Sequence, residues 1–149
     1  MSFRRLTPLS TYEAFRDYLD SSGIDLPVDA AVDPSGPLSE PVDVAGHIVG
    51  NRFAALPMEG WDCAADGNPG DLTRRRWERI GAGGSKLIWG GEAAAVREDG
   101  RSSGHQLLVA EHTVDGIADL RSRLVSAHAA ACGTTDDLLV GLQLTHSGR

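Results

Sequence analysis

Three apolar stretches of the sequence each lead into polar residues that are suited to chemistry. The stretches at residues 52–56, 86–91 and 138–144 are followed, in turn, by Met58, Glu59, Trp61 and Asp62, by Glu92 and Arg97, and by Thr145, His146 and Arg149. Carboxylates, imidazoles and guanidinium groups bind charged ligands and hold or move protons. Because the carboxyl ends of parallel strands meet at one edge of a sheet, these residues would gather into a single site.

The elements that must position these residues are three strands separated by helical patterns. Residues 52–56 are almost continuously apolar, which predicts a strand covered on both faces, and Pro57 ends it because proline cannot donate to a strand ladder. Leu87–Gly91 and Leu138–Leu144 predict the second and third strands. This alternation of strands and helices favours an α/β barrel or an open α/β sheet.

Two helices are predicted between these strands. Asp71 is a plausible N-cap for a helix reaching about Ala82, with Arg74 and Glu78 paired four residues apart. Its inward face would consist of Leu72, Trp77 and Ile80. The glycine-rich segment at residues 81–86 follows a helix and opens a strand, so it predicts a turn and not a phosphate loop. A second helix is predicted from Thr113 to Ala131, ended by Gly133.

The first part of the chain predicts an extension, a linker and a hairpin. Ser10 and Glu13 have the spacing of a capping box for a helix at residues 10–22, which Gly23 would end. Prolines interrupt residues 25–41, and two short apolar runs at residues 42–49 predict a hairpin. We therefore divide the chain into an N-terminal extension with its linker (residues 1–41) and a strand-containing part (residues 42–149).

Composition narrows the classes of function. The 149 residues carry a net charge of -7, which disfavours nucleic acid as a partner, and the basic run Arg74–Arg76 is expected to form a solvated helix face. No apolar stretch approaches the roughly 18 residues of a membrane span, and no signal peptide is recognisable. Cys63 and Cys132 lack the spacing of a metal site, so no metal is expected and the cytoplasm is the simplest location.

Three blocks of the sequence resemble one family. Residues 51–58, residues 89–93 with 96–101, and residues 141–149 are similar to the old yellow enzymes, which are FMN-dependent NAD(P)H:flavin oxidoreductases. The most distinctive part is Gln-Leu-Thr-His-Ser-Gly-Arg at residues 143–149. The resemblance runs from about Val42 to the last residue. It implies a (β/α)₈ TIM barrel, of which about three strands are present here. A complete barrel needs eight strands and about 250 residues, so the chain is expected to be the N-terminal portion of one.

The resemblance also implies which residues would contact FMN. Gln143 matches the glutamine that binds the polar edge of the flavin ring, and a side-chain amide offers both a donor and an acceptor there. Pro57, Met58 and Glu59 match the first flavin-contacting turn, although Glu59 stands where many members carry a small residue. Ala93 matches the small residue that borders the ring, and Trp61 would lie on the substrate side or anchor the loop.

Neighbouring charged residues are expected to have structural roles. Glu92 would be a buried carboxylate paired with Arg97, Arg101 or Arg149, and His146 would belong to a supporting hydrogen-bond network. No catalytic residue and no metal ligand is assigned within these 149 residues.

The resemblance implies the activity of the complete protein. NAD(P)H would reduce FMN, and the reduced flavin would pass a hydride to a small electron acceptor, an electron-poor alkene. The present chain alone would be inactive, because the substrate-binding and phosphate-binding groups come from later strands. Two alternatives stay open: a dienoyl-CoA reductase or amine dehydrogenase-like flavoenzyme with a further iron–sulfur domain, and a non-catalytic half-barrel binding module. Assembly into a homo-oligomer also stays open.

Overall fold

The computed structural model describes residues 8–148, which form two compact units, one up to Gly36 and one from Pro37 onward. The first unit contains helix α1 (Tyr12–Ser22). Thr11, and not Ser10 as predicted, is its N-cap, because the Thr11 hydroxyl accepts the Ala14 N–H at 3.2 Å. Gly23 adopts the left-handed conformation and ends the helix as predicted.

The second unit opens with a short 3₁₀ turn, η1 (Pro37–Ser39), and a hairpin. Strands β1 (Val42–Val44) and β2 (His47–Val49) pair antiparallel around a turn at Ala45 and Gly46, both of which have positive φ. The hairpin predicted at residues 42–49 is therefore confirmed.

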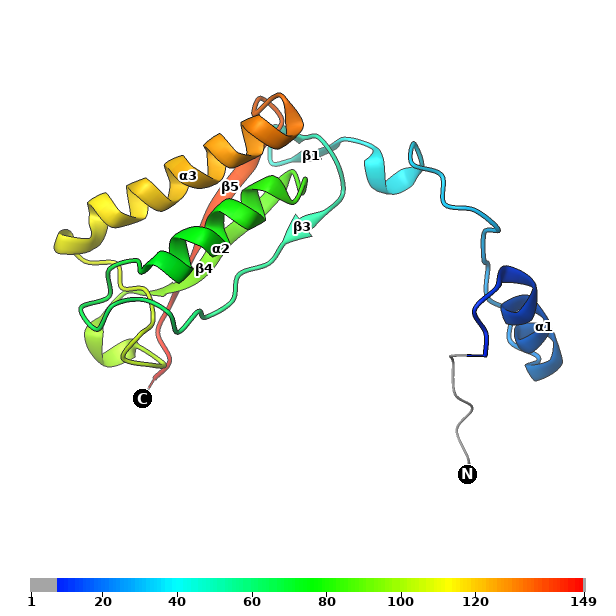
Figure 1. Cartoon of the computed structure of the whole chain (residues 1–149), viewed down its shortest axis with the longest axis horizontal. Coiled ribbons are helices and arrows are strands. Elements are labelled where there is room, and N and C mark those ends of the chain that lie inside the picture. The colour runs from blue at the N-terminus through cyan, green and yellow to red at the C-terminus, as the bar shows by residue number, and fades with distance from the viewer. Residues whose placement is uncertain (1–7, 149) are drawn as a thin grey trace. The chain divides into compact units, whose positions relative to one another are not determined.

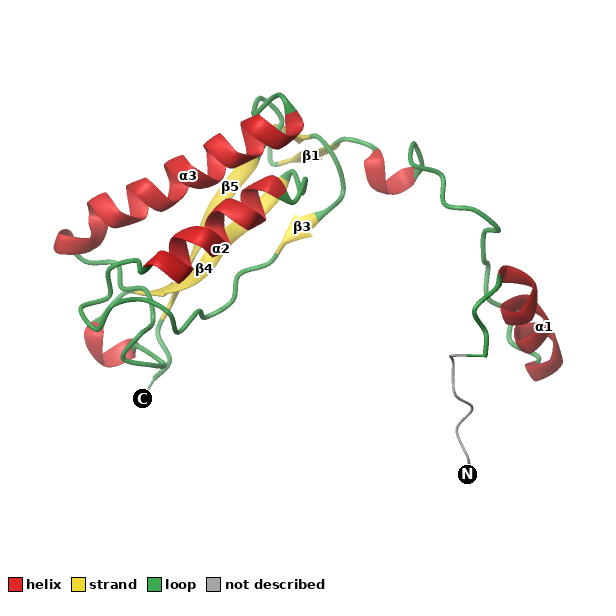
Figure 2. Cartoon of the chain, viewed as in Figure 1, coloured by secondary structure: helices red, strands yellow, loops and turns green. Residues whose placement is uncertain are grey.

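A parallel sheet and two helices make up the rest of the second unit. The strands β3 (Ala54–Ala55), β4 (Leu87–Ala95) and β5 (Leu139–Thr145) are ordered β3-β4-β5. The helices α2 (Asp71–Ala82) and α3 (Val114–Cys132) lie side by side on the sheet (Figures 1 and 2), and the short 3₁₀ turns η2 (Glu98–Gly100) and η3 (Glu111–Thr113) follow β4. This confirms an α/β fold with three parallel strands.

The hydrophobic core lies between the sheet and the two helices. Its fully or almost fully buried members are Cys63, Trp77, Ile88, Ala94, Leu107, Leu120 and Leu124. Gly81 lets the helices approach closely, since a Cβ there would overlap the carbonyl group of Leu124. Burial of these side chains supplies the main favourable contribution to folding of this unit.

On the opposite face of the sheet, the described residues leave the first half of β4 open around Trp89, whereas Ala93, Ala94 and Ala95 in its second half are all buried. Trp89 neighbours the buried Ile88 and therefore points to this other face, where 47% of it is exposed. Leu56, just past β3, is 74% exposed. The prediction that residues 52–56 are covered on both faces is wrong for the described part of the chain, and β3 itself is only two residues long.

The start and outer face of α2 also differ from the prediction. Asp71 was predicted to be the N-cap, but Gly70 is the N-cap and Asp71 is the first helical residue. The Thr73 hydroxyl, in the first turn of the helix, accepts the Gly70 N–H at 3.2 Å. Leu72 was expected to face inward but is 54% exposed, whereas Trp77 is buried as predicted.

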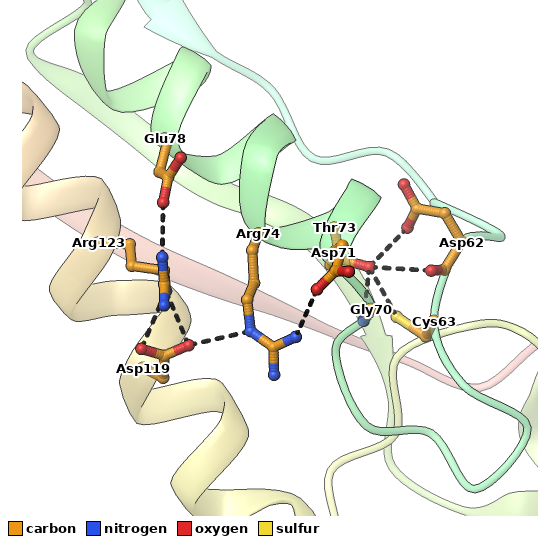
Figure 3. A network of polar contacts seen from close by, with 9 residues as sticks. All are labelled: Asp62, Cys63, Gly70, Asp71, Thr73, Arg74, Glu78, Asp119 and Arg123. Carbon is orange, nitrogen blue, oxygen red and sulfur yellow. Dashed lines mark hydrogen bonds and ion pairs between the residues drawn. The ribbon is translucent and has the colours of Figure 1, made fainter.

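The expected pairing of Arg74 with Glu78 is replaced by contacts between the helices. Arg74 binds Asp119 at 3.1 Å, and Glu78 accepts from Arg123 at 2.8 Å, so both side chains reach across to α3 (Figure 3). The neighbouring helix α3 supplies both partners, and Arg74 also contacts Asp71 of its own helix at 3.5 Å.

Strand β4 contains a bulge that the sequence analysis did not foresee. Trp89 pairs with Gly141 and Ala93 pairs with Gln143, so three residues of β4 stand opposite one residue of β5. Gly90 has φ +70°, a conformation that favours glycine. The bulge carries β4 on to Ala95, past its predicted end at Gly91.

Candidate functional site at the carboxyl ends of the strands

Three of the residues predicted to contact a cofactor lie next to one another in the structure. The Ala93 N–H donates to the carbonyl oxygen of Met58 at 3.0 Å, which joins β4 to the turn after β3. On its other side Ala93 is the register partner of Gln143 in β5. The half-buried Pro57 leads into this turn. The three strands thus bring Met58, Ala93 and Gln143 into one row.

Two of the predicted residues present free polar side chains. Gln143 and Glu59 are both exposed, and neither side chain hydrogen-bonds to another residue in the range 8–148. The Gln143 amide therefore has a donor and an acceptor available for a ligand. The Glu59 carboxylate is solvated beside the same turn.

Trp61 is held by a chain of hydrogen bonds that leads back to Ala93. Its indole N–H donates to the Ser102 hydroxyl at 3.2 Å, and that hydroxyl donates to Gln106 Oε1 at 3.0 Å. Gln106 Nε2 donates to the carbonyl oxygen of Ala93 at 2.9 Å. Trp61 remains 62% exposed. Sequence reasoning missed Ser102 and Gln106, because nothing in their spacing signals a buried amide.

Glu92 is the most buried charged residue at this edge. Its side chain is 0% exposed, its Oε2 lies 2.7 Å from Arg76 Nη2, and its Oε1 accepts the N–H of Gly60. The predicted structural ion pair is therefore present, but its partner is Arg76 of α2 and none of the predicted arginines. Arg97 pairs with Asp99 instead.

The other two predicted partners of Glu92 are placed as follows. Arg101 pairs with Glu98 at 2.9 Å and also donates to the carbonyl oxygens of Ala65 and Gln106. It thereby clamps the loop after β4. Arg149 lies outside the described residues.

The guanidinium group of Arg76 serves two carboxylates. Besides Glu92, it binds Asp62 Oδ1 at 2.7 Å, and it donates through Nη1 to the carbonyl oxygen of Gly91 at 2.8 Å. Asp62 also accepts the hydroxyl of Thr73 at 2.9 Å (Figure 3). Two carboxylates and one guanidinium group leave one net negative charge when all three are ionised.

This arrangement separates the acidities of the two carboxyl groups. Burial raises the pKa of Glu92 to about 7, against the opposing attraction of Arg76. Burial also acts on Asp62, but hydrogen bonds from Arg76 and Thr73 outweigh it and lower the pKa of Asp62 below its usual value. Of the two carboxyl groups, Glu92 is thus the one that holds a proton more readily.

His146 belongs to the turn that ends the described chain. Its Nδ1 accepts the Gly148 N–H at 3.1 Å, its Nε2 lies 3.9 Å from Asp99, and its ring packs over Gly100. A Cβ at Gly100 would lie 2.5 Å from the nearest ring atom, Cδ2. Within residues 8–148 the ring supports loop packing.

Other kinds of site are not found in the described part of the chain. No group of three or more histidine, cysteine or acidic residues there could hold a metal ion, and both cysteines are free. No helix among these residues is long and apolar enough to cross a lipid bilayer.

Comparison with known proteins points to one fold. No protein-family model and no curated protein matches the chain. A 2-naphthoyl-CoA reductase, solved in complex with 2-naphthoyl-CoA, matches 76% of this chain with a TM-score of 0.61 and 21% identity. The old yellow enzyme homologue from Zymomonas mobilis matches 74% with a TM-score of 0.59 and 16% identity. The old yellow enzyme from Pichia sp. AKU4542 matches 74%, with a TM-score of 0.58 and 14% identity.

The chain has the fold of part of an old yellow enzyme barrel. It spans 16%, 28% and 26% of the lengths of these three structures, respectively. The α/β fold and its relation to a TIM barrel, both predicted from the sequence, are therefore confirmed. At these identities the likeness concerns the fold alone.

Proposed function

We propose that the strand-end site is part of an FMN site in an NAD(P)H-dependent oxidoreductase that reduces electron-poor alkenes. The observation that carries the proposal is the row formed by Met58, Ala93 and Gln143, in which Ala93 is hydrogen-bonded to one neighbour and paired with the other. These residues come from three strand ends. In an α/β barrel, ligands bind at that edge of the sheet.

The residues present fit the flavin. The free amide of Gln143 suits the polar edge of the ring, and the small Ala93 leaves room for a flat group beside the backbone. Pro57, Met58 and Glu59 would border the ring from the first turn, and Trp61 would line the substrate side. Bound FMN would supply hydride transfer between NAD(P)H and the alkene.

Glu59 would tune the flavin. A carboxylate close to the ring disfavours the anionic reduced form electrostatically, so it lowers the reduction potential. Its exposure and its lack of a partner within residues 8–148 leave it free to act in this way. Replacement by glutamine is expected to raise the potential of the bound flavin.

We further propose that these 149 residues do not turn over substrate by themselves. They span about a quarter of the length of the old yellow enzymes that they resemble in fold. The groups that bind the substrate and the flavin phosphate would come from further strands of a complete barrel.

A test uses the complete product of the gene that contains this sequence. The purified protein is expected to show the flavin absorption spectrum, to release FMN on denaturation, and to oxidise NAD(P)H when an electron-poor alkene is added. Gln143→Ala should weaken FMN binding, whereas Gln143→Glu should disturb the ring edge through its charge. A colourless product that binds no added FMN would refute the proposal and favour a non-catalytic binding module.

A second candidate substrate is an unsaturated or aromatic acyl-CoA thioester. The structural likeness to a 2-naphthoyl-CoA reductase supports it, as that protein was solved with its thioester bound. Turnover with acyl-CoA thioesters but not with simple enones, together with iron in the purified protein, would favour this candidate.

A further inference from the structure

We propose that Arg76 and Glu92 are positioning residues that hold the turn at residues 57–62 against β4, and thereby fix the geometry of the strand-end site. The importance of this turn for a cofactor rests on the proposed function. The tether itself is a property of the described chain and is tested separately.

Arg76 joins three parts of the chain through one side chain. Its Nη2 lies 2.7 Å from Asp62 Oδ1 in the turn and 2.7 Å from Glu92 Oε2 in β4, while its Nη1 donates to the Gly91 carbonyl oxygen at 2.8 Å. A planar guanidinium group can donate in these directions at once. A lysine ammonium group in its place is a single point charge and cannot reproduce the set.

Glu92 completes the tether from the side of the strand. One of its oxygens binds Arg76 and the other accepts the backbone N–H of Gly60 in the turn. The side chain is fully buried, so water does not compete for these contacts. A buried carboxylate with partners on both oxygens fixes its neighbours more firmly than an exposed ion pair does.

Gly60 shows how closely the turn is seated on this pair. A Cβ at Gly60 would lie 2.7 Å from the Arg76 Cζ and 2.8 Å from Glu92 Oε1. No larger residue fits there unless the pair moves. The glycine, the guanidinium group and the carboxylate therefore pack as one unit.

The position of this unit connects it to the candidate site. Ala93 directly follows Glu92, and its N–H donates to the Met58 carbonyl oxygen at 3.0 Å, two residues before Gly60. The tether and this hydrogen bond run in parallel between the same two segments. Loss of the tether would leave the Ala93–Met58 bond as the remaining hydrogen bond between the turn and β4 among the described residues, although Trp61 and Asp62 would still be held by Ser102 and Thr73.

Amide hydrogen exchange in the 149-residue chain at about pH 8 tests the tether. Glu92→Ala is expected to speed exchange of the Gly60 amide by about tenfold relative to the Ala95 and Val109 amides, which report on the core. Glu92→Gln keeps an oxygen that can accept the Gly60 N–H, so it should restore most of the protection. Arg76→Lys should speed exchange of the same amide although it keeps the positive charge.

A matched control is Arg97→Lys, which makes the same change in the exposed pair with Asp99 and should leave Gly60 within about twofold of the wild type. Equal acceleration of the Gly60 and Ala95 amides would show that the pair stabilises only the whole unit, and would overturn the proposal. Unchanged exchange at Gly60 in all the variants would also overturn it. If Glu92→Ala does not fold, Glu92→Gln and Arg76→Lys decide between these outcomes.

FMN titration of the complete gene product separates this proposal from the proposed function. If both hold, Arg76→Lys weakens FMN affinity by about tenfold and Arg97→Lys does not. A wild-type protein that binds no FMN but shows the exchange pattern above refutes the flavin role and leaves the tether standing. A flavin-binding wild type with unchanged exchange in the variants refutes the tether alone.

Discussion

Glu92 makes the folding stability of the chain depend on pH, and the direction of this dependence follows from its raised pKa. Its pKa rises from 4.5 to about 7 because folding buries it. The folded state therefore binds this proton more tightly than the unfolded state, so the stability that it contributes is full below about pH 4.5 and is lost as the pH rises towards 7. The loss amounts to about 3 kcal/mol at most.

Urea unfolding at about pH 5 and about pH 8 measures this effect. We expect the wild type to lose stability between these pH values and Glu92→Gln, which does not titrate, to lose less. Among the neighbours, Asp62 has a lowered pKa and Arg76 a raised one, and burial raises the pKa of the Cys63 thiol, so none of them titrates within this window. Identical pH profiles of wild type and variant would contradict the assignment.

The two cysteines should differ in reactivity. Cys63 is 4% exposed and its pKa is raised by burial, whereas Cys132 is half-buried at the end of α3. Because the thiolate is the reactive form, a disulfide reagent is expected to modify Cys132 in the folded chain and Cys63 only after unfolding. The variant Cys132→Ser should then show no fast reaction. A fast phase that survives in this variant would place Cys63 at the surface.

The residue contacts show where sequence reasoning reaches its limit. The proximity of Met58, Ala93 and Gln143 was predictable, because it depends only on strand ends meeting at one edge of a parallel sheet. The partner of Glu92 was not predictable. Arg76 looked like part of a solvated basic run, and only the packing of α2 on β4 turns that side chain inward.

At the level of the elements, the bulge in β4 sets the alignment of Ala93 with Gln143. Gly90 has φ +70°, and a Cβ there would lie 2.7 Å from the Glu92 carbonyl oxygen and 3.3 Å from two backbone atoms of β5. Gly90→Ala therefore combines backbone strain with overlap. We expect a loss of about 2–3 kcal/mol in the free energy of unfolding.

Two control variants separate these causes in urea unfolding. Gly84 also has positive φ but open space around its Cβ position, so Gly84→Ala should cost only about 1 kcal/mol. Gly104 has open space and no positive φ, so Gly104→Ala should be close to neutral. Equal costs at Gly90 and Gly84 would mean that the close approach to β5 has no energetic weight.

Element ends followed the sequence where local chemistry decides them. Gly23 and Gly133 end their helices in the left-handed conformation, and the Ala45–Gly46 turn forms the predicted hairpin. The start of α2 was predicted one residue too late. There the Thr73 hydroxyl accepts the N–H of the N-cap residue Gly70, which has no capping side chain of its own. The bulge in β4 was not predicted, because the adjacent glycines Gly90 and Gly91 are as typical of the end of a strand as of a bulge.

At the scale of the whole molecule, the sheet of the described chain has one face covered by helices and one face that is open around Trp89, at the start of β4. Helices α2 and α3 lie on one face of the sheet (Figure 2). Ile88 is buried on that face, whereas its neighbour Trp89 points to the other face and is exposed, as is Leu56 just past β3. The sequence predicted strands buried on both faces because its apolar runs are nearly continuous. That pattern is typical of a closed barrel, in which both faces of each strand are buried. The described residues bury the start of β4 on one face only.

Exposed apolar surface of this kind binds hydrophobic dyes. We expect the 149-residue chain to enhance the fluorescence of an anilinonaphthalene sulfonate dye, and Trp89→Gln to reduce that signal because it removes the largest apolar side chain from the open face. Val114→Gln is the matched control, since Val114 is exposed on α3, away from this face. Equal dye fluorescence for both variants and the wild type would show that the open face is not the binding surface.

The same dye connects the open face to the proposed function. In a complete barrel, Trp89 and Leu56 would be enclosed by further strands, so the complete gene product should bind less dye per molecule than the 149-residue chain does. Trp89→Gln should then leave the dye signal of the complete product unchanged, but it should lower the free energy of unfolding because the residue has become part of a core. A complete product whose dye binding still depends on Trp89 would mean that the face stays open and that this chain serves as a binding module.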